Sequence, residues 1–406
     1  MLKQRRFFVF VAAIVALLAA FVLAALFSQD QSESDNSNSE KTSSAEGPAL
    51  QMGPVVETVL TGLDNPRGVV VLSDGSLMVA EAGIGLKSDN PQELTGRLTH
   101  FQDTNKDGDY SDEGERVVWL DNLPTYNALS EYSTWRDEVS GPGELLRHTD
   151  GHLYLTVDGG HGKIGVYEVS PYKQMGRNLS ARGNMNGLAF SRDHTDIYIA
   201  ESTANALSVV NIDDGTHRNI TQFGALASGQ QSVPTGVAVD PRNGDLLVAL
   251  FTGSLVVDGE TIAFVPGDSV IVRVDPESGA IEDAVLGLTT AIDVAVDGDG
   301  NIYVVEMTGG PADPIEPTHD LFDPDQAPLH GGYLRFTGRV TRYAPDGSAE
   351  YLLAEGLDMP TNITLFSPNE IYISTGQGTP NRPIPGPDGP TTIVGEVVRI
   401  TLPDEN

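Results

Sequence analysis

One acidic segment of the chain has the spacing of a calcium-binding loop. It runs "DTNKDGDYSDEGE" from residue 103 to residue 115. In such a loop, alternate residues of a curled chain direct oxygen atoms at one centre, a glycine at position six allows the tight turn, and position seven binds through its carbonyl. Here these places hold Asp103, Asn105, Asp107, Gly108 and Asp109. Position twelve is Gly114 instead of a bidentate Glu, so Asp112, Glu113 or Glu115 has to complete the shell. An acidic turn without an ion is the alternative.

A second group of polar residues lies where short predicted strands begin or end. The starts of first strands carry Asn65, Arg67, Asn184, Asn186, Thr235, Asp293, Thr361 and Asn362, and the ends of second strands carry Glu81, Asp158, His161, Glu201 and Glu306. If these side chains converge, the carboxylates can hold a cation or act as general acids or bases, and His161 can act as a base. The catalytic candidates are His161, Glu81, Glu201 and Glu306, and Asn186, Asp158 and Asp293 are candidates for a second metal site. The alternative is a solvated rim whose carboxylates accept hydrogen bonds from backbone amides.

Six similar hairpins must position these side chains. They are "NPRGVVVLSDGSLMVAE" from Asn65, "SGPGELLRHTDGHLYLTVD" from Ser140, "NMNGLAFSRDHTDIYIAES" from Asn184, "VPTGVAVDPRNGDLLVAL" from Val233, "TAIDVAVDGDGNIYVVE" from Thr290 and "DMPTNITLFSPNEIYIST" from Asp358. Each has a short apolar strand, a turn rich in Asp, Gly or Asn, and a second strand. One or two further strands follow each hairpin. About four strands per unit, repeated radially, are typical of a β-propeller. The sequence therefore predicts an all-β, six-bladed β-propeller, with a pair of β-sandwiches as the alternative.

The two ends of the repeat region predict how the ring closes. The last hairpin is followed by one more strand, "GEVVRITL" from Gly395, so the sixth blade lacks an outer strand. The segment "PVVETVL", residues 54–60, stands before the first hairpin without a blade of its own. We expect this N-terminal strand to complete the last blade and to remove an open sheet edge.

The predicted blades also sort the loops by face. Long insertions follow second strands at residues 82–95, 251–267, 307–337 and 375–394, and residues 121–139 join the same face. Long loops on a rigid scaffold are a common place for function, so we expect an unknown ligand or protein partner there. The calcium loop falls between the third and fourth strands of the first blade, on the opposite face. No amphipathic helix flanks it, so it is no EF-hand, and its expected calcium ion has a structural role.

The motif "LDNPRGVVVLSDGSLMVAEAG", with the later "IDVAVDGDGNIYVVE", resembles the ScyD/ScyE family of exported bacterial six-bladed propellers. The resemblance covers about residue 55 to the C-terminus and implies the fold and export, with no catalytic residue. A looser likeness exists to gluconolactonase and regucalcin propellers, whose third-blade Asn binds a divalent metal; this implies a metal-binding role for Asn186. The chain departs from that pattern, because Thr235 stands where those proteins have an Asp, and Asn65-Pro66-Arg67 replaces a metal-binding Glu-Gly-Pro.

The N-terminus predicts an extracytoplasmic protein. Residues 1–6 carry Lys3, Arg5 and Arg6, and residues 7–27 form an uninterrupted apolar run about long enough to span a bilayer. We expect residues 1–28 to be a membrane anchor or, if they are cleaved after Val22-Leu23-Ala24, a signal peptide. Residues 29–53 are polar and predict a flexible linker, and residues 54–406 form the propeller.

Composition excludes several classes of function. The chain has 57 acidic and 24 basic side chains, a net charge of −33, which disfavours nucleic acid as a partner and leaves the N-terminal helix as the only expected membrane contact. There is no cysteine, so disulfides, thiolate metal sites and a cysteine nucleophile are excluded.

Two functional hypotheses remain. The first is an exported, membrane-tethered propeller that acts as a ligand- or protein-binding scaffold with a structural Ca²⁺ ion. The second is a divalent-metal-dependent hydrolase, lactonase or lyase whose site lies at the mouth of the central channel. Whether the protein is an enzyme therefore stays open.

Overall fold

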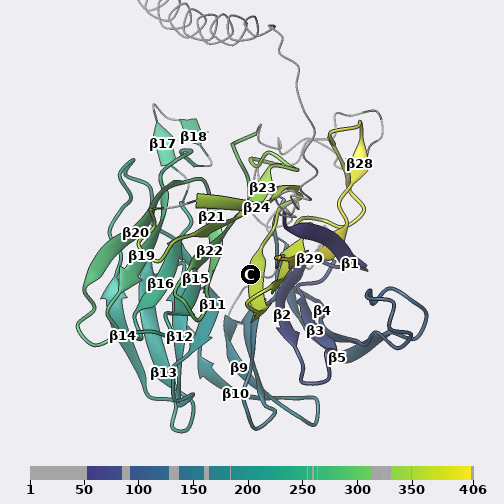
Figure 1. The fold of residues 1–406 in the computed structure, drawn as a ribbon, viewed down its shortest axis with the longest axis horizontal. Coiled ribbons are helices and arrows are strands. Elements are labelled where there is room, and N and C mark those ends of the chain that lie inside the picture. The colour runs from purple at the N-terminus through teal and green to yellow at the C-terminus, as the bar shows by residue number, and fades with distance from the viewer. Residues whose placement is uncertain are drawn as a thin grey trace, which may run out of the picture. The chain divides into compact units, whose positions relative to one another are not determined.

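Apolar strands separated by Asp, Gly and Asn turns fold into six antiparallel sheets of four or five strands (Figure 1). The computed structural model describes residues 53–84, 92–127, 137–159, 164–182, 184–253, 255–257, 260–262, 264–312, 323, 325, 331–348 and 350–403. The described residues belong to one compact unit, residues 52–406. The predicted anchor and linker lie outside these residues, apart from Gly53. In the described part of the chain, no helix has the length and apolar character needed to cross a membrane.

Each sheet is one blade of a propeller. Blade 1 contains β2 (Pro66–Val71), β3 (Leu77–Glu81), β4 (Gln92–Phe101) and β5 (Arg116–Asn127), with β6 (Val139–Ser140) at its outer edge. Blade 2 contains β7 (Pro142–Arg147), β8 (Leu153–Asp158), β9 (Ile164–Ser170) and β10 (Gln174–Ser180). Blade 3 contains β11 (Met185–Phe190), β12 (Asp196–Glu201), β13 (Ala206–Asn211) and β14 (His217–Gln222). Blade 4 contains β15 (Pro234–Val239), β16 (Leu246–Leu250), β19 (Ser269–Val274) and β20 (Ile281–Leu288). Blade 5 contains β21 (Ala291–Val296), β22 (Ile302–Glu306), β23 (Gly338–Tyr343) and β24 (Glu350–Leu357). Blade 6 contains β25 (Asn362–Ser367), β26 (Glu370–Thr375), β29 (Gly395–Thr401) and β1 (Val55–Leu63).

The first strand of each hairpin is the innermost strand of its blade. These inner strands contact one another in cyclic order, from β2 through β7, β11, β15, β21 and β25 and back to β2. The predicted six-bladed propeller is therefore confirmed.

The ring closes as the sequence predicts. Strand β1 pairs antiparallel with β29, from Val55 opposite Thr401 to Leu63 opposite Gly395. Figure 1 shows the purple N-terminal strand beside the yellow C-terminal strand. The closing strand supplies the outer edge of blade 6, and side chains of blade 6 then hydrogen-bond to blade 1, as Thr364 does to the Val69 carbonyl at 2.8 Å.

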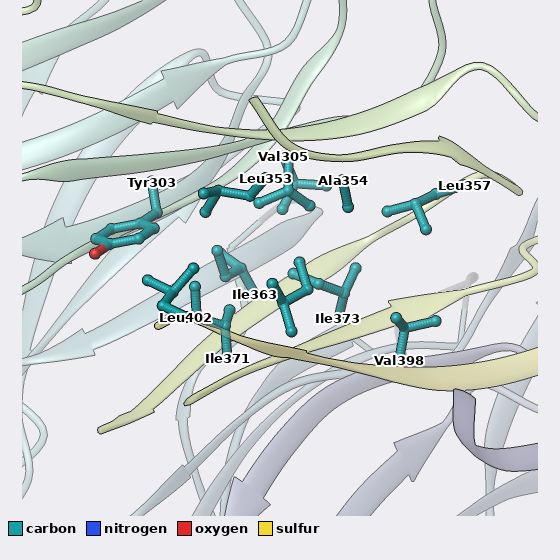
Figure 2. Packing of buried hydrophobic residues seen from close by; sticks show 12 residues of the cluster. Tyr303, Val305, Leu353, Ala354, Leu357, Ile363, Ile371, Ile373, Val398 and Leu402 are labelled. Atoms are coloured by element: carbon teal, nitrogen blue, oxygen red, sulfur yellow. The ribbon is translucent and has the colours of Figure 1, made fainter. Parts of the chain in front are cut away.

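Apolar side chains fill the spaces between neighbouring blades. Figure 2 shows one such cluster, in which Tyr303, Val305 and Leu353 of blade 5 face Ile371, Ile373 and Val398 of blade 6. A similar cluster lies at each of the other blade interfaces. Successive side chains of a strand point to opposite faces of the blade, so each blade packs against both neighbours. Most of the large apolar side chains that are exposed lie on outer strands.

The predicted insertions follow second strands. The insertion in blade 4 contains a short hairpin of β17 (Leu255–Val257) and β18 (Glu260–Ile262), and that in blade 6 contains β27 (Pro383–Ile384) and β28 (Thr391–Thr392). One difference concerns residues 121–139, because β5 continues to Asn127 and pairs with β6 there.

The closing strand makes a direct prediction about stability. Leu60 is 1% exposed in the cluster between blades 6 and 1, whereas Val56 on the same strand is 44% exposed. We expect Leu60→Ala to lower the free energy of unfolding by about 2–5 kcal/mol, because it leaves a cavity, and Val56→Ala to change it by less than about 0.5 kcal/mol. Urea denaturation of both variants measures this, and equal losses would contradict the closure.

Candidate functional site

The inner strands approach one another closely at one level, which is the third residue of the strand in blades 1–5 and the first residue of β25 in blade 6. The six residues there are Gly68, Glu144, Gly187, Gly236, Asp293 and Asn362, in the order of the blades. A Cβ atom on Gly68 would lie 2.4 Å from the backbone nitrogen of Leu145, and one on Gly236 would lie 2.4 Å from Oδ1 of Asp293. Three blades therefore need glycine at this level, while the other three contribute polar side chains.

These three polar side chains bind one another; we call them the axial plug. The Nδ2 atom of Asn362 donates to Oε2 of Glu144 at 2.8 Å and to Oδ2 of Asp293 at 2.9 Å. Asp293 also accepts the backbone N–H groups of Ile363 and Val294, both at 2.9 Å. The amide of blade 6 can reach Glu144 of blade 2 because the blade between them carries Gly68.

Burial of the plug changes its protonation. Burial raises the pKa of Asp293 to about 7. Burial, together with the negative charge of Asp293, raises the pKa of Glu144 well above its ordinary value. All the donors to these carboxyls that the structure describes are neutral amides. The pair therefore keeps a proton to a higher pH than ordinary carboxyl groups do, and carboxyls with raised pKa values are common at functional sites.

Two cavities lie among the inner strands. The first, of about 430 Å³, is lined by the starts of inner strands and by the insertions; we call it the mouth cavity. The second, of about 470 Å³, is lined by all six inner strands further along, including Glu144 and Asp293; we call it the channel cavity. Both volumes are in the range of small-molecule sites.

The mouth cavity has a polar side and an apolar side. Its polar lining includes Arg67, Asn186 and Thr235 from the second position of three inner strands. Asn186 donates to Ser202, and Ser202 donates to the Pro234 carbonyl at 2.7 Å, which links blades 3 and 4. The apolar side contains Phe251, Met307 and Tyr333, which belong to one buried cluster, together with Ile292 packed against it.

Arg67 carries the positive charge of the mouth cavity. It is half-buried, and burial lowers its pKa, whereas the carboxylates of Glu138 and Asp158 act in the opposite direction. The Nη2 atom donates to the Val139 carbonyl at 2.8 Å. A guanidinium has five N–H donors, and this is the one hydrogen bond that Arg67 donates to a described residue.

The glutamates at the ends of second strands have partners within their own blades. Glu81 accepts Arg97 Nε at 2.9 Å and the Asp64 backbone N–H at 2.8 Å, and it is fully buried. Burial alone would raise the pKa of Glu81, but Arg97 and Arg116 bring it below its ordinary value.

The two other glutamates also have partners within their own blades. Glu306 binds Arg339 and the backbone N–H of Thr289, and Glu201 binds Ser208 and lies 3.2 Å from His217 Nε2. None of the three glutamates is among the residues that line the mouth or channel cavity in the described part of the structure.

The other predicted residues are dispersed. Asn186 and Asp158 line the mouth cavity, while Asp293 belongs to the axial plug and lines the channel cavity. His161 lies outside the described residues. Sequence reasoning missed Glu144 and Glu138. The signal for Glu144 was the break in the repeat, since "PGELLR" has Glu where three other hairpins have Gly.

The predicted calcium loop connects β4 and β5 and is held by its own side chains. Asp103 accepts the backbone N–H groups of Lys106 and Gly108, at 2.5 and 3.1 Å, and Asn105 donates to Asp112 at 2.6 Å. Glu115 accepts the Thr104 backbone N–H at 2.7 Å, and such amide bonds lower its pKa. Asp107 and Asp109 are bound to backbone amides in the same way. Among the described residues, no group of three or more His, Cys, Asp or Glu side chains is already arranged to hold a metal ion.

The fold and the cavities define a six-bladed β-propeller with a polar and apolar cavity where its inner strands begin. The chain belongs to the SMP-30/gluconolactonase/LRE-like family, whose sequence model matches residues 57–291. No curated protein matches the chain. The match concerns this wider family, and the narrower resemblance to ScyD/ScyE proteins stays a prediction.

Solved structures with a similar fold have very different sequences. A gluconolactonase from Xanthomonas campestris has 11% identity and a TM-score of 0.49, over 86% of this chain and 89% of that one. An aldose sugar dehydrogenase from Streptomyces coelicolor has 12% identity and a TM-score of 0.47, over 86% and 98%. A Bacteroides thetaiotaomicron protein of unknown function has 11% identity and a TM-score of 0.50, over 85% and 76%. At such identities the likeness shows the fold alone.

The axial plug predicts how stability depends on pH. Its carboxyls titrate at higher pH in the folded protein than their ordinary values of 3.8 and 4.5, so the folded state holds protons that the unfolded chain releases. The free energy of unfolding should therefore fall as the pH rises from about 4 through about 7 and above. In Glu144→Gln this fall should be smaller, because glutamine has no proton to release. A difference of one in the pKa between the folded and unfolded states corresponds to about 1.4 kcal/mol.

Urea denaturation at pH 5 and pH 8 measures the difference. The matched control is Glu355→Gln, on an exposed position of β24, which should keep the wild-type pH dependence. Equal slopes for wild type and Glu144→Gln would contradict the proton held at the plug.

Proposed function

We propose that this propeller is an extracytoplasmic binding module that holds a small ligand in the mouth cavity. The observation that carries the proposal is the cavity itself, because its lining comes from all six blades, as Arg67, Thr156, Asn186, Thr235, Met307 and Gln377 illustrate. A cavity of about 430 Å³ with one apolar wall and convergent polar groups is the usual form of a small-molecule site.

The partners of the predicted catalytic glutamates favour binding over turnover. Glu81 and Glu306 each bind an arginine and a backbone amide, and these contacts hold the hairpin to the third strand of the blade. A general acid or base has to reach its substrate, whereas these carboxylates are buried against their own blades. They support the scaffold that carries the mouth cavity.

The mouth residues do not fit the divalent metal that gluconolactonase-type propellers bind. Asn186 is present, but Thr235 offers a hydroxyl in place of a carboxylate, and its Oγ1 donates to the Ala291 carbonyl at 3.4 Å. Arg67 puts a positive charge where those propellers have a metal-binding Glu-Gly-Pro, and the carboxylates of the cavity, Glu138 and Asp158, come from other positions. The metal-dependent hydrolase or lyase is therefore the weaker candidate, and no metal-assisted step is derived for this chain.

Two further parts of the proposal come from the sequence. The apolar run at residues 7–27 supports export with a membrane tether, and the ScyD/ScyE resemblance agrees with export. The loop at residues 103–115 supports a structural Ca²⁺ ion held by Asp103, Asn105, Asp107, Asp109 and Glu115. Tyr110 of this loop donates its backbone N–H to the Val59 carbonyl at 3.1 Å, so an ion there would also brace the closing strand β1.

Filling the mouth cavity tests the binding proposal. A small-molecule library should contain compounds that raise the melting temperature of the protein, because a ligand that binds only the folded state stabilises it. Asn186→Phe, which occupies the cavity, should abolish these shifts, and Asn219→Phe on an exposed position of β14 should keep them. Shifts that survive Asn186→Phe would place the ligand elsewhere and refute the proposal.

Calcium binding is tested by the melting temperature in chelator and in excess Ca²⁺. At a free Ca²⁺ concentration of about 100 times the dissociation constant, the ion should add about 2.7 kcal/mol to the free energy of unfolding. Asp107→Asn should remove most of this gain, whereas Asp299→Asn in an exposed turn of blade 5 should leave it. The same curve with chelator and with Ca²⁺ would mean that residues 103–115 form an acidic turn only.

A further inference from the structure

Three charged side chains line the mouth cavity, those of Arg67, Glu138 and Asp158. Arg67 and Glu138 form no ion pair with each other or with another described residue. Arg67 makes one hydrogen bond within the described part of the chain, to the Val139 carbonyl. Glu138 makes none there, and its carboxylate acts on Arg67 only at longer range. Both side chains are half-buried, so each has lost part of its hydration without gaining a charged partner in return.

Other arginines on this face are paired. Arg335 binds both carboxylate oxygens of Asp358, and Arg382 donates from Nε to Asp137 Oδ2 at 2.6 Å. Both guanidinium groups are almost completely buried. The arginines that stabilise this face therefore bind a carboxylate directly, whereas Arg67 binds a backbone carbonyl among the described residues.

The segment that carries Glu138 is fixed on both sides. Asp137 accepts the Thr379 backbone N–H at 3.0 Å as well as Arg382, which ties it to the insertion of blade 6. Val139 on the other side accepts Arg67. The two charges are therefore preorganised relative to each other, and a preorganised pair binds a ligand with a smaller entropic cost.

The remaining wall of the cavity is apolar. Phe251, Met307 and Tyr333 are each less than 10% exposed and pack in one cluster. A ligand that satisfies the whole cavity needs an anionic group for Arg67, a cationic group for Glu138 and an apolar body for this wall.

We infer that the mouth cavity binds a small zwitterion with an apolar substituent, the chemistry of an apolar α-amino acid. The carboxylate of the ligand accepts hydrogen bonds from the Arg67 guanidinium, whose planar shape suits a bidentate contact. The ammonium group donates to the Glu138 carboxylate. The side chain lies against Phe251, Met307 and Tyr333, where it loses contact with water. The inference rests on the proposed function, because it names the ligand class of the same cavity.

Calorimetric titration of the full chain with L-phenylalanine tests the inference. Three comparison compounds each lack one feature: 3-phenylpropanoate has no ammonium group, 2-phenylethylamine has no carboxylate, and glycine has no side chain. L-Phenylalanine should bind, and each comparison compound should bind at least about tenfold more weakly, because each lacks one of the three contacts that the cavity offers.

Variants locate the ligand. Arg67→Met and Glu138→Gln should each raise the dissociation constant of L-phenylalanine at least about tenfold, and Arg67→Lys should recover only part of the loss because it cannot make the bidentate contact. The matched control is Arg147→Met, an exposed arginine that lines the channel cavity, which should change the constant less than about twofold. Melting temperatures confirm that each variant is folded.

The outcomes separate this inference from the proposed function. Equal binding of 3-phenylpropanoate, or an unchanged constant in Glu138→Gln, would overturn the zwitterion. No heat with any of the four compounds would also overturn it, and the proposed function would still stand if library compounds gave melting shifts that Asn186→Phe removes. If neither experiment gave a ligand, both would fall.

Discussion

The antiparallel pairing of β1 with β29 is the contact on which the rest of this structure depends. Each blade is held mainly by its two neighbours, because the apolar clusters lie between blades and not within one blade. An open ring would leave blades 1 and 6 with one unburied face each. The closing strand prevents this because it puts the N-terminal and C-terminal parts of the chain into one sheet. The inner strands can then converge, and the mouth cavity exists only when all six do so.

The close approach of the inner strands decides what can occupy the axis. Glycine at the third position of blades 1, 3 and 4 allows neighbouring backbones to come within the space of a methyl group. The space that remains is filled by Glu144, Asp293 and Asn362, whose hydrogen bonds join blades 2, 5 and 6. Because the pKa values of these two carboxyls are raised, the folded state loses stability as the pH rises, and carboxyls perturbed in this way cluster at functional sites.

Much of the fold could be predicted from the sequence, because it depends on a pattern that repeats. The six hairpins, the closing strand and the insertions after second strands all follow from the spacing of apolar residues and turns. The continuation of β5 to Asn127 and its pairing with β6 could not be predicted, because two-residue strands carry almost no sequence pattern. The site could be predicted only in part. Arg67 and Asn186 were visible at strand starts, but Glu138 lies in an insertion without a repeat to compare it with.

Glu81 and Glu306 show why acidic residues at equivalent positions of a repeat are a poor indicator of a catalytic site. Glu81 and Glu306 occupy equivalent places, and each holds the backbone N–H two residues before its inner strand and an arginine that begins the pairing of the third strand. A residue that recurs in several blades is most simply explained by a need that every blade shares, which is structural. A ligand in the mouth cavity touches each blade differently, so its residues should differ from blade to blade. The residue just before the level of the axial plug meets this condition. It is Arg67, Gly143, Asn186, Thr235 and Ile292 in blades 1–5, which all line the mouth cavity, and Thr361 in blade 6. In this propeller, the repeat identifies the scaffold, and the departures from it identify the site.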